Sequence, residues 1–192
     1  MQRDERESYV SVLRGELTRL NRSLAEMLTQ TTIPTADSQE RFDLRSLVGE
    51  LGTLLAPQGG RQGVELSIGL PPEDVPMVGY RDRLKQAFLN VAVNALEAMP
   101  QGGRMRIEME RSQDRVRVTV RDTGPGIPAE LLARIYESDF TTKGGGSGIG
   151  LYVARAVVEL HGGSIEAHSN LGRGTDVQVD LPLLPRHRRP AE

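Results

Sequence analysis

The chain has 192 residues, of which 38% are hydrophobic, 26% charged and 4% aromatic, so it can bury a mainly aliphatic core in one domain with an appended element. It contains no cysteine, which excludes a disulfide scaffold, a thiolate metal site and a cysteine nucleophile. The formal charge is -2 and no apolar run approaches the roughly 20 residues of a membrane-spanning helix, so we expect a chain without nucleic-acid or membrane contacts. We expect it to be cytoplasmic, either as a protein of its own or as the cytoplasmic part of a membrane-bound protein.

The N-terminal residues 1–32 have the pattern of a coiled-coil or bundle helix. Apolar residues recur there at alternating steps of three and four: Val10, Leu13, Leu17, Leu20, Leu24 and Met27. A narrow apolar seam favours pairing with a second helix; packing on the rest of the chain is the alternative. Pro34 stops the pattern, and we interpret residues 33–42 as a linker.

Residues 43–184 alternate between helical and strand patterns and are predicted to form one α+β domain. Asp43 can cap a helix that we expect to end at the Pro and Gly residues of positions 57–60. Further helices are predicted at about residues 81–99, 129–136 and 149–160, and strands at about residues 64–68, 105–109, 116–120, 164–167 and 176–181. These elements predict a two-layer sandwich of antiparallel strands with helices on one face. Residues 185–192 are interpreted as a solvated basic tail.

Two asparagines on the predicted helix 81–99 form the first candidate site. Asn90 and Asn94 are four residues apart and therefore share one face of the helix. Asparagine oxygens suit Mg²⁺ that keeps most of its waters and bridges to phosphates. Two solvated or helix-bonding asparagines are the alternative interpretation of the pair alone.

Two glycine-rich segments supply the other candidate features. Residues 122–127 directly follow a predicted strand; the Asp122 carboxylate can accept a hydrogen bond from an exocyclic amine, and the glycines let a flat ring approach the backbone. A tight turn is the alternative. Residues 144–150 run into a predicted helix, whose free N–H groups can receive phosphate oxygens. Thr141, Thr142 and Lys143 add two hydroxyls and a cation to a loop able to close over a nucleotide.

In this order, the segments resemble the nucleotide-binding domain of sensor histidine kinases, within the superfamily that includes the gyrase, mismatch-repair and heat-shock chaperone ATPases. The matching segments are residues 90–99 (N box), 122–127 (G1 box), 136–143 (F box), 144–151 (G2 box), and 161–163 with 172–175 (closing segment). The resemblance covers about residues 43–184. It implies the Bergerat-type ATP-binding fold, with a mixed, mostly antiparallel sheet.

The resemblance also implies a role for each matching residue. Asn94 would hold Mg²⁺ against the phosphates, while Asn90 and Lys143 would serve the catalytic step. Asp122 would bind the adenine amine, with Gly126 and Thr175 near the base. The implied ATP-binding residues are Asn90, Asn94, Asp122, Gly124, Gly126, Ile127, Thr141, Thr142, Lys143, Gly146, Ser147, Gly148, Ile149, Gly150, Leu151 and Thr175.

Four positions refine this resemblance. ATP-hydrolysing relatives carry a glutamate one helical turn before the metal asparagine, and the amide of Asn90 cannot replace it as a base, so attack by water is disfavoured. His161 could act as a base, but its position after the predicted helix 149–160 favours a structural role. Asp139 in the F box and Val177 in the last strand stand where the family commonly has aromatic residues.

The distribution of histidine leads to the functional hypothesis. Residues 16–28 resemble the second helix of the family's dimerisation and phosphoacceptor hairpin, and no histidine precedes His161. We expect the ATP-binding catalytic domain of a two-component sensor histidine kinase, homodimeric through the complete hairpin and serving a response-regulator receiver domain, that cannot phosphorylate itself. The alternative is an acceptor-less ATP-binding module that docks on and modulates a kinase or response regulator. A serine kinase acting on an anti-sigma antagonist is a third hypothesis, which the heptad helix disfavours.

Overall fold

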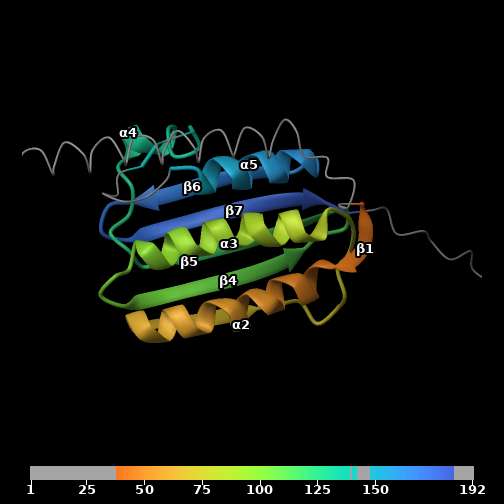
Figure 1. Cartoon of the computed structure of the whole chain (residues 1–192), viewed down its shortest axis with the longest axis horizontal. Coiled ribbons are helices and arrows are strands. Elements are labelled where there is room, and N and C mark those ends of the chain that lie inside the picture. The colour runs from red at the N-terminus through yellow and green to blue at the C-terminus, as the bar shows by residue number, and fades with distance from the viewer. Residues whose placement is uncertain (1–37, 139, 142–147, 184–192) are drawn as a thin grey trace, which may run out of the picture.

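The computed structural model describes residues 38–138, 140–141 and 148–183, which form a sheet layer and a helix layer (Figure 1). The elements are β1 (Glu40–Asp43), α2 (Leu44–Gln62), β2 (Val64–Gly69), β3 (Pro76–Gly79), α3 (Arg81–Glu97), β4 (Gly103–Arg111), β5 (Arg115–Asp122), α4 (Ala129–Leu132), α5 (Gly150–Leu160), β6 (Ser164–Asn170) and β7 (Gly174–Pro182). Helices α2, α3 and α5 lie side by side on one face of the sheet (Figure 1). This arrangement confirms the predicted two-layer sandwich.

The main sheet has five strands in the order β2-β4-β5-β7-β6. Strands β2 and β4 run parallel, and the other neighbouring pairs are antiparallel. The sheet is therefore mixed and mostly antiparallel, as the resemblance implies. Because β7 lies between β5 and β6, the last strand of the domain is an interior strand of the sheet.

The core lies between the sheet and the three long helices. Alternate residues of β4 and β5 face the helices and are almost wholly buried, as the period-2 pattern predicts. The largest fully buried side chains include Phe88, Leu44, Leu47, Leu51, Leu84, Leu96, Met105, Ile107 and Leu181. Aliphatic residues thus dominate the interior, as the low aromatic content predicts.

The opposite face of the sheet is polar. Arg117 pairs with Asp180, and Arg121 pairs with Asp176, across the β5–β7 ladder, with N···O distances of 3.0 and 2.7 Å. Such partly exposed ion pairs each contribute about 0–1 kcal/mol, so they add little to stability. They form part of the polar surface of this face.

Helix α2 differs from the prediction because it passes through residues 57–60. The helix continues across Pro57 and ends only before Gly63, which is left-handed and donates its N–H to the carbonyl oxygens of Gly59 and Gly60. Leu55 and Gly59, on either side of the proline, are both buried. Burial of this face offsets the hydrogen bond that the proline cannot donate, and tertiary packing therefore overrides the local break signal.

The second difference lies in the predicted linker, residues 33–42. Its last residues belong to β1, which pairs antiparallel with β3, a strand that the sequence did not predict. Asp43 joins this small sheet to α2, because its Oδ1 accepts the N–H groups of Arg45 (3.0 Å) and Val75 (2.8 Å). Although burial acts to raise it, these hydrogen bonds hold the pKa of Asp43 below its usual value.

The remaining predictions concern the two ends of the chain, one short helix and membrane-spanning segments. The expected helix of residues 1–32 and the basic tail of residues 185–192 lie outside the described residues. A helix is expected at about residues 129–136, but the structure has only the shorter helix α4, which ends at Leu132. No helix in the described part of the chain is long and apolar enough to cross a membrane.

Candidate nucleotide-binding site

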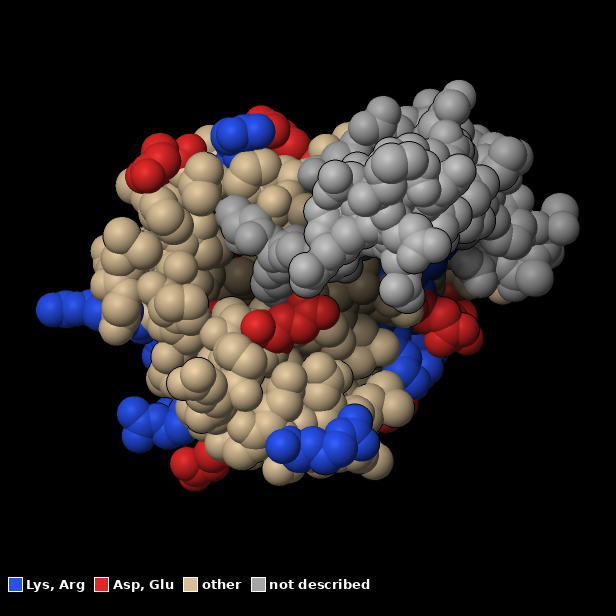
Figure 2. All heavy atoms as spheres, turned by 60° about the vertical axis from the view of Figure 1, so that its left-hand side comes forward, with Lys and Arg blue, Asp and Glu red and all other residues tan. Residues whose placement is uncertain are grey.

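A cavity of about 720 Å³ opens between α3, α5 and the C-terminal end of β5. It lies at the left-hand end of the molecule in Figure 1, the end that Figure 2 turns toward the viewer, where the surface is hollowed. Ten of the predicted ATP-binding residues line it: Asn90, Asn94, Asp122, Gly126, Ile127, Thr141, Gly148, Gly150, Leu151 and Thr175. Its volume is in the range of small-molecule sites.

The other predicted residues are distributed in two groups. Gly124 and Ile149 do not line the cavity themselves, but each is adjacent in sequence to a residue that does. Thr142, Lys143, Gly146 and Ser147 lie outside the described residues, as does Asp139. The phosphate and catalytic roles assigned to this second group stay predictions.

The walls of the cavity are largely apolar, which sequence motifs did not predict. Leu89 and Val93 line it from α3, and Ile135, Phe140 and Val177 are among the other apolar lining residues. An apolar slot with a few fixed polar groups is the usual environment of a bound aromatic ring. Val177, noted from the sequence only as a departure from the family pattern, therefore forms part of the wall.

Asp122 is the buried acidic group of the cavity. It is the last residue of β5 and is only 6% exposed. Its Oδ1 accepts the backbone N–H groups of Gly124 (2.8 Å) and Thr175 (3.3 Å). These two hydrogen bonds fix the orientation of a hydrogen-bond acceptor inside an apolar cavity.

The turn after Asp122 is held closely against the β6–β7 turn. Gly126 has φ +75°, and a side chain at this position would overlap the carbonyl oxygen of Asn170. The N–H of Gly172 donates to the carbonyl oxygen of Pro125 at 2.8 Å. The glycine predicted to allow close approach of a ring is thus also required by the approach of a second backbone segment.

The two asparagines of α3 lie against the first turn of α5. Asn90 Nδ2 donates to the carbonyl oxygen of Gly150 at 3.1 Å, and Asn90 Oδ1 accepts from Gln86 Nε2 at 3.0 Å. A Cβ atom on Gly150 would lie 3.5 Å from Asn94 Nδ2. The N-terminus of α5 thus lies against both amides, and the structure brings the N box and the start of the G2 helix together.

His161 lies at the opposite end of α5, where it contacts the start of α3. The N–H of Tyr80 donates to His161 Nε2 at 2.9 Å, and Nδ1 lies 2.7 Å from the carbonyl oxygen of Val157. A backbone N–H can only donate, so Nε2 is the acceptor and Nδ1 carries the proton. Burial lowers the pKa of His161 and favours this neutral form. These contacts support the structural role predicted for it.

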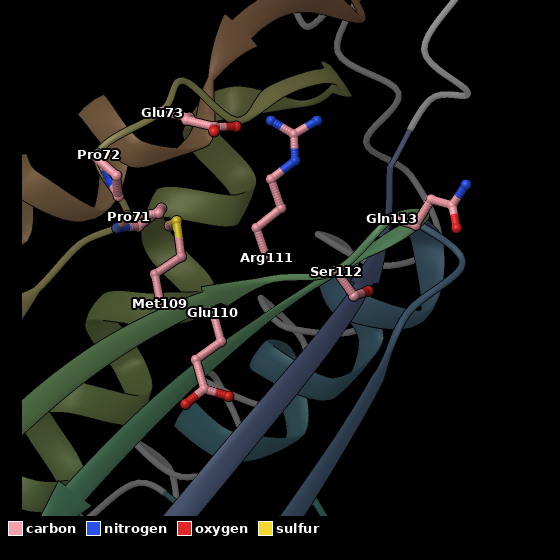
Figure 3. A pocket seen from close by; sticks show the side chains of 8 residues that line it. All are labelled: Pro71, Pro72, Glu73, Met109, Glu110, Arg111, Ser112 and Gln113. Atoms are coloured by element: carbon pink, nitrogen blue, oxygen red, sulfur yellow. The ribbon is translucent and has the colours of Figure 1, made fainter.

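A second hollow, of about 530 Å³, lies at the other end of β4. It is lined by Pro71, Pro72, Glu73, Met109, Glu110, Arg111, Ser112 and Gln113 (Figure 3). Arg111 reaches across it and donates to the carbonyl oxygen of Asp74 at 2.6 Å. Because Met105, near the start of β4, pairs with Asp122, this hollow is separate from the nucleotide cavity.

Comparison with known proteins identifies the family. A family model described as "Histidine kinase-, DNA gyrase B-, and HSP90-like ATPase" matches residues 79–185, which include the entire cavity lining. The chain belongs to this family. Sporulation kinase D of Bacillus subtilis (strain 168) is 34% identical over 181 residues, which cover 94% of this chain and 36% of the relative. The chain thus spans about a third of the length of this curated relative.

Solved structures place the chain among the histidine-kinase members of this ATPase family. The nucleotide-free catalytic domain of histidine kinase ThkA is 32% identical, with a TM-score of 0.71 over 79% of this chain and 99% of that domain. Histidine kinase ThkA in complex with the response regulator protein TrrA is 29% identical, with a TM-score of 0.72 over 94% of this chain and 52% of that one. The chain therefore contains an ATP-binding catalytic domain of the sensor-histidine-kinase type, which confirms the resemblance.

Proposed function

We propose that this chain supplies the ATP-binding and phosphoryl-donating part of a cytoplasmic two-component sensor kinase. The cavity would hold ATP with the base against Asp122 and the phosphates toward the junction of α3 and α5. The γ-phosphoryl would pass to a histidine nitrogen as its bond to the bridging oxygen of ADP breaks. The observation that carries this proposal is the convergence of Asp122, Asn94 and Gly150 on one apolar cavity.

The described residues fit Mg²⁺ with few protein ligands. They contain no group of three or more His, Cys, Asp or Glu side chains able to hold a metal ion. Asn94 lines the cavity beside the first turn of α5, and its amide oxygen is the kind of ligand that Mg²⁺ combines with phosphate oxygens and waters. When bound, Mg²⁺ would neutralise charge on the transferred phosphoryl group.

The acceptor histidine would come from outside the ATP-binding domain. His161 uses both ring nitrogens in hydrogen bonds to the backbone, so neither can attack a phosphoryl group without breaking a contact of the fold. His168 lies on β6 and pairs in register with Asp176, on the polar face of the sheet. The phosphoacceptor would be carried by a dimerisation hairpin, to which residues 1–32 would contribute one helix.

A response regulator is the proposed partner of the complete kinase. The support comes from the structure of histidine kinase ThkA in complex with TrrA, to which 94% of this chain is similar. The phosphoryl group on histidine would pass to an aspartate of the regulator's receiver domain. The receiver domain would dock on the assembled kinase rather than enter the ATP cavity.

Incubation of the purified chain with γ-labelled ATP and Mg²⁺ tests the assignment of acceptor and donor. The chain alone should bind nucleotide by calorimetry but retain no label after denaturing electrophoresis. Addition of an acceptor hairpin from a similar kinase such as sporulation kinase D should produce acid-labile label on the hairpin. Stable label on this chain alone would contradict the proposal, as would failure of the chain to bind ATP. Gln113→Ala, in the separate hollow at the far end of β4, is the matched control and should leave binding unchanged.

A further inference from the structure

One serine outside the predicted nucleotide motifs connects three parts of the cavity wall. Ser169 lies on β6 and pairs in register with Thr175 on β7. Its Oγ lies 2.8 Å from the backbone nitrogen of Ile127, 2.8 Å from the carbonyl oxygen of Gly174 and 2.9 Å from Thr175 Oγ1. The hydroxyl therefore bonds the turn after Asp122, the backbone of β7 and the side chain of a cavity residue.

The donor in each of these hydrogen bonds follows from the chemistry of the groups. Ile127 N–H can only donate to Ser169 Oγ, and the carbonyl oxygen of Gly174 can only accept from it. A hydroxyl has a single proton and two lone pairs. Since that proton is directed to Gly174, the Thr175 hydroxyl must donate to Ser169 in the remaining contact.

This direction fixes the polarity of Thr175 toward the cavity. Thr175 is 7% exposed and lines the cavity, and its backbone N–H donates to Asp122 Oδ1. With its proton directed at Ser169, Thr175 Oγ1 has only lone pairs for a ligand. Asp122 and Thr175, which this backbone hydrogen bond joins, thus both present acceptor oxygens to the cavity.

We infer that Ser169 is a positioning residue that makes the site selective for a 6-amino purine over a 6-keto purine. The inference rests on the proposed binding of ATP in this cavity. An exocyclic amine donates to acceptor oxygens, whereas a keto oxygen would face their lone pairs and remain without a donor. Buried polar groups without partners are the main source of strong discrimination between similar ligands. Without Ser169, the Thr175 hydroxyl can rotate and donate to a keto oxygen.

The test compares the dissociation constants of ADP and inosine diphosphate, which differ at the 6-position of the base. The selectivity ratio is the dissociation constant of inosine diphosphate divided by that of ADP. We expect Ser169→Ala to reduce this ratio by about three- to tenfold, which is the value of one hydrogen bond, mainly because inosine diphosphate binds relatively better. Ser169→Thr keeps the hydroxyl and should keep the wild-type ratio. Ser164→Ala, an exposed serine on the same strand, is the matched control.

The ratio separates positioning from general loosening of the site. A merely structural loss would weaken both nucleotides equally, and an unchanged ratio in a folded Ser169→Ala protein would overturn the inference. Thr175→Val removes the Thr175 hydroxyl itself and should reduce the ratio as well. If Ser169→Ala does not fold, an unchanged ratio in Thr175→Val would overturn the inference. If the wild-type chain bound neither nucleotide, the proposed function would fail together with this inference. Normal ADP binding with unchanged ratios in both variants would refute this inference alone.

Discussion

Asp122 illustrates how one side chain is held for binding by the backbone around it. Its Oδ1 accepts two backbone N–H bonds, and the residue is 6% exposed. The sequence predicted this residue because an acid followed by glycines at the end of a strand is a recognisable pattern. It could not predict the bond from Thr175, because that contact joins residues 53 positions apart.

Replacement of Asp122 by Asn should weaken ADP binding by about 10- to 150-fold. The amide keeps the size of the side chain but replaces a charged acceptor, and hydrogen bonds to charged groups are worth about 1.5–3 kcal/mol. Isothermal titration calorimetry measures the change. Asp114→Asn, in the turn between β4 and β5, is the control and should bind ADP normally. Equal affinities of the wild type and Asp122→Asn would refute the assignment of Asp122 to the base.

Asn94→Ala should remove the dependence of nucleotide binding on Mg²⁺. The wild-type chain should bind ADP more tightly with Mg²⁺ than with a chelator, because the amide oxygen of Asn94 would complete the coordination of a phosphate-bound ion. In the variant, the two affinities should be the same within error. Titrations with and without Mg²⁺ measure this difference, and Gln113→Ala should behave as the wild type. A variant that keeps the full effect of Mg²⁺ would show that another group holds the ion.

At the scale of elements, α5 is attached to α3 at both of its ends. Asn90 bonds the carbonyl oxygen of Gly150 at the cavity end, and His161 bonds the N–H of Tyr80 at the far end. The ring of Tyr80 also meets that of His161 edge to face, with centroids 5.8 Å apart. The position of α5 over α3, and hence the shape of the cavity, therefore depends on a neutral histidine about one helix length away.

The His161 contact should make stability depend on pH below neutrality. Burial and the nearby Arg83 guanidinium lower the pKa of His161, so the unfolded chain binds a proton more readily than the folded one. The contribution of neutral His161 to stability is fully present above its pKa in the unfolded chain, about 6.5, and is lost as pH falls toward its lower pKa in the folded chain. Denaturant unfolding should show a larger loss of stability between pH 7.5 and pH 5.5 for the wild type than for His161→Gln. Identical pH dependence in the two proteins would contradict the assignment.

The elements that the sequence predicted correctly are those with strong local patterns. Helix α3 and strands β4 and β5 have regular spacing of apolar residues and clear polar breaks between them. Strand β3 has only four residues and begins at a proline, so its pairing with β1 depends on contacts that no local pattern reports. Ser169 escaped prediction for a related reason, because its function depends on partners from two other segments.

At the scale of the whole molecule, the proposed ligand should stabilise the fold. Binding to the folded state alone adds about 2.7 kcal/mol when ADP is present at 100 times its dissociation constant. For a domain of this size, that free energy corresponds to a rise in Tm of about 5–10 °C. Thermal unfolding with and without ADP and Mg²⁺ measures the rise. Asp122→Asn at the same ADP concentration should show about half of this rise or less, because its affinity is at least about tenfold lower, while its Tm without ligand should stay near that of the wild type. A shift of equal size in both proteins would place the nucleotide elsewhere.

The position of β7 has a consequence for the synthesis of the protein. This strand is the last described element of the chain, yet it lies between β5 and β6 and carries Thr175 into the cavity. The β5–β7 ladder joins Arg115 to Pro182, so this edge of β5 is paired only by residues far away in sequence. Until β7 has been synthesised and inserted, the edge of β5 stays open and the cavity lacks Thr175 and Val177. We therefore expect the domain to bind ATP only after β7 has inserted beside β5.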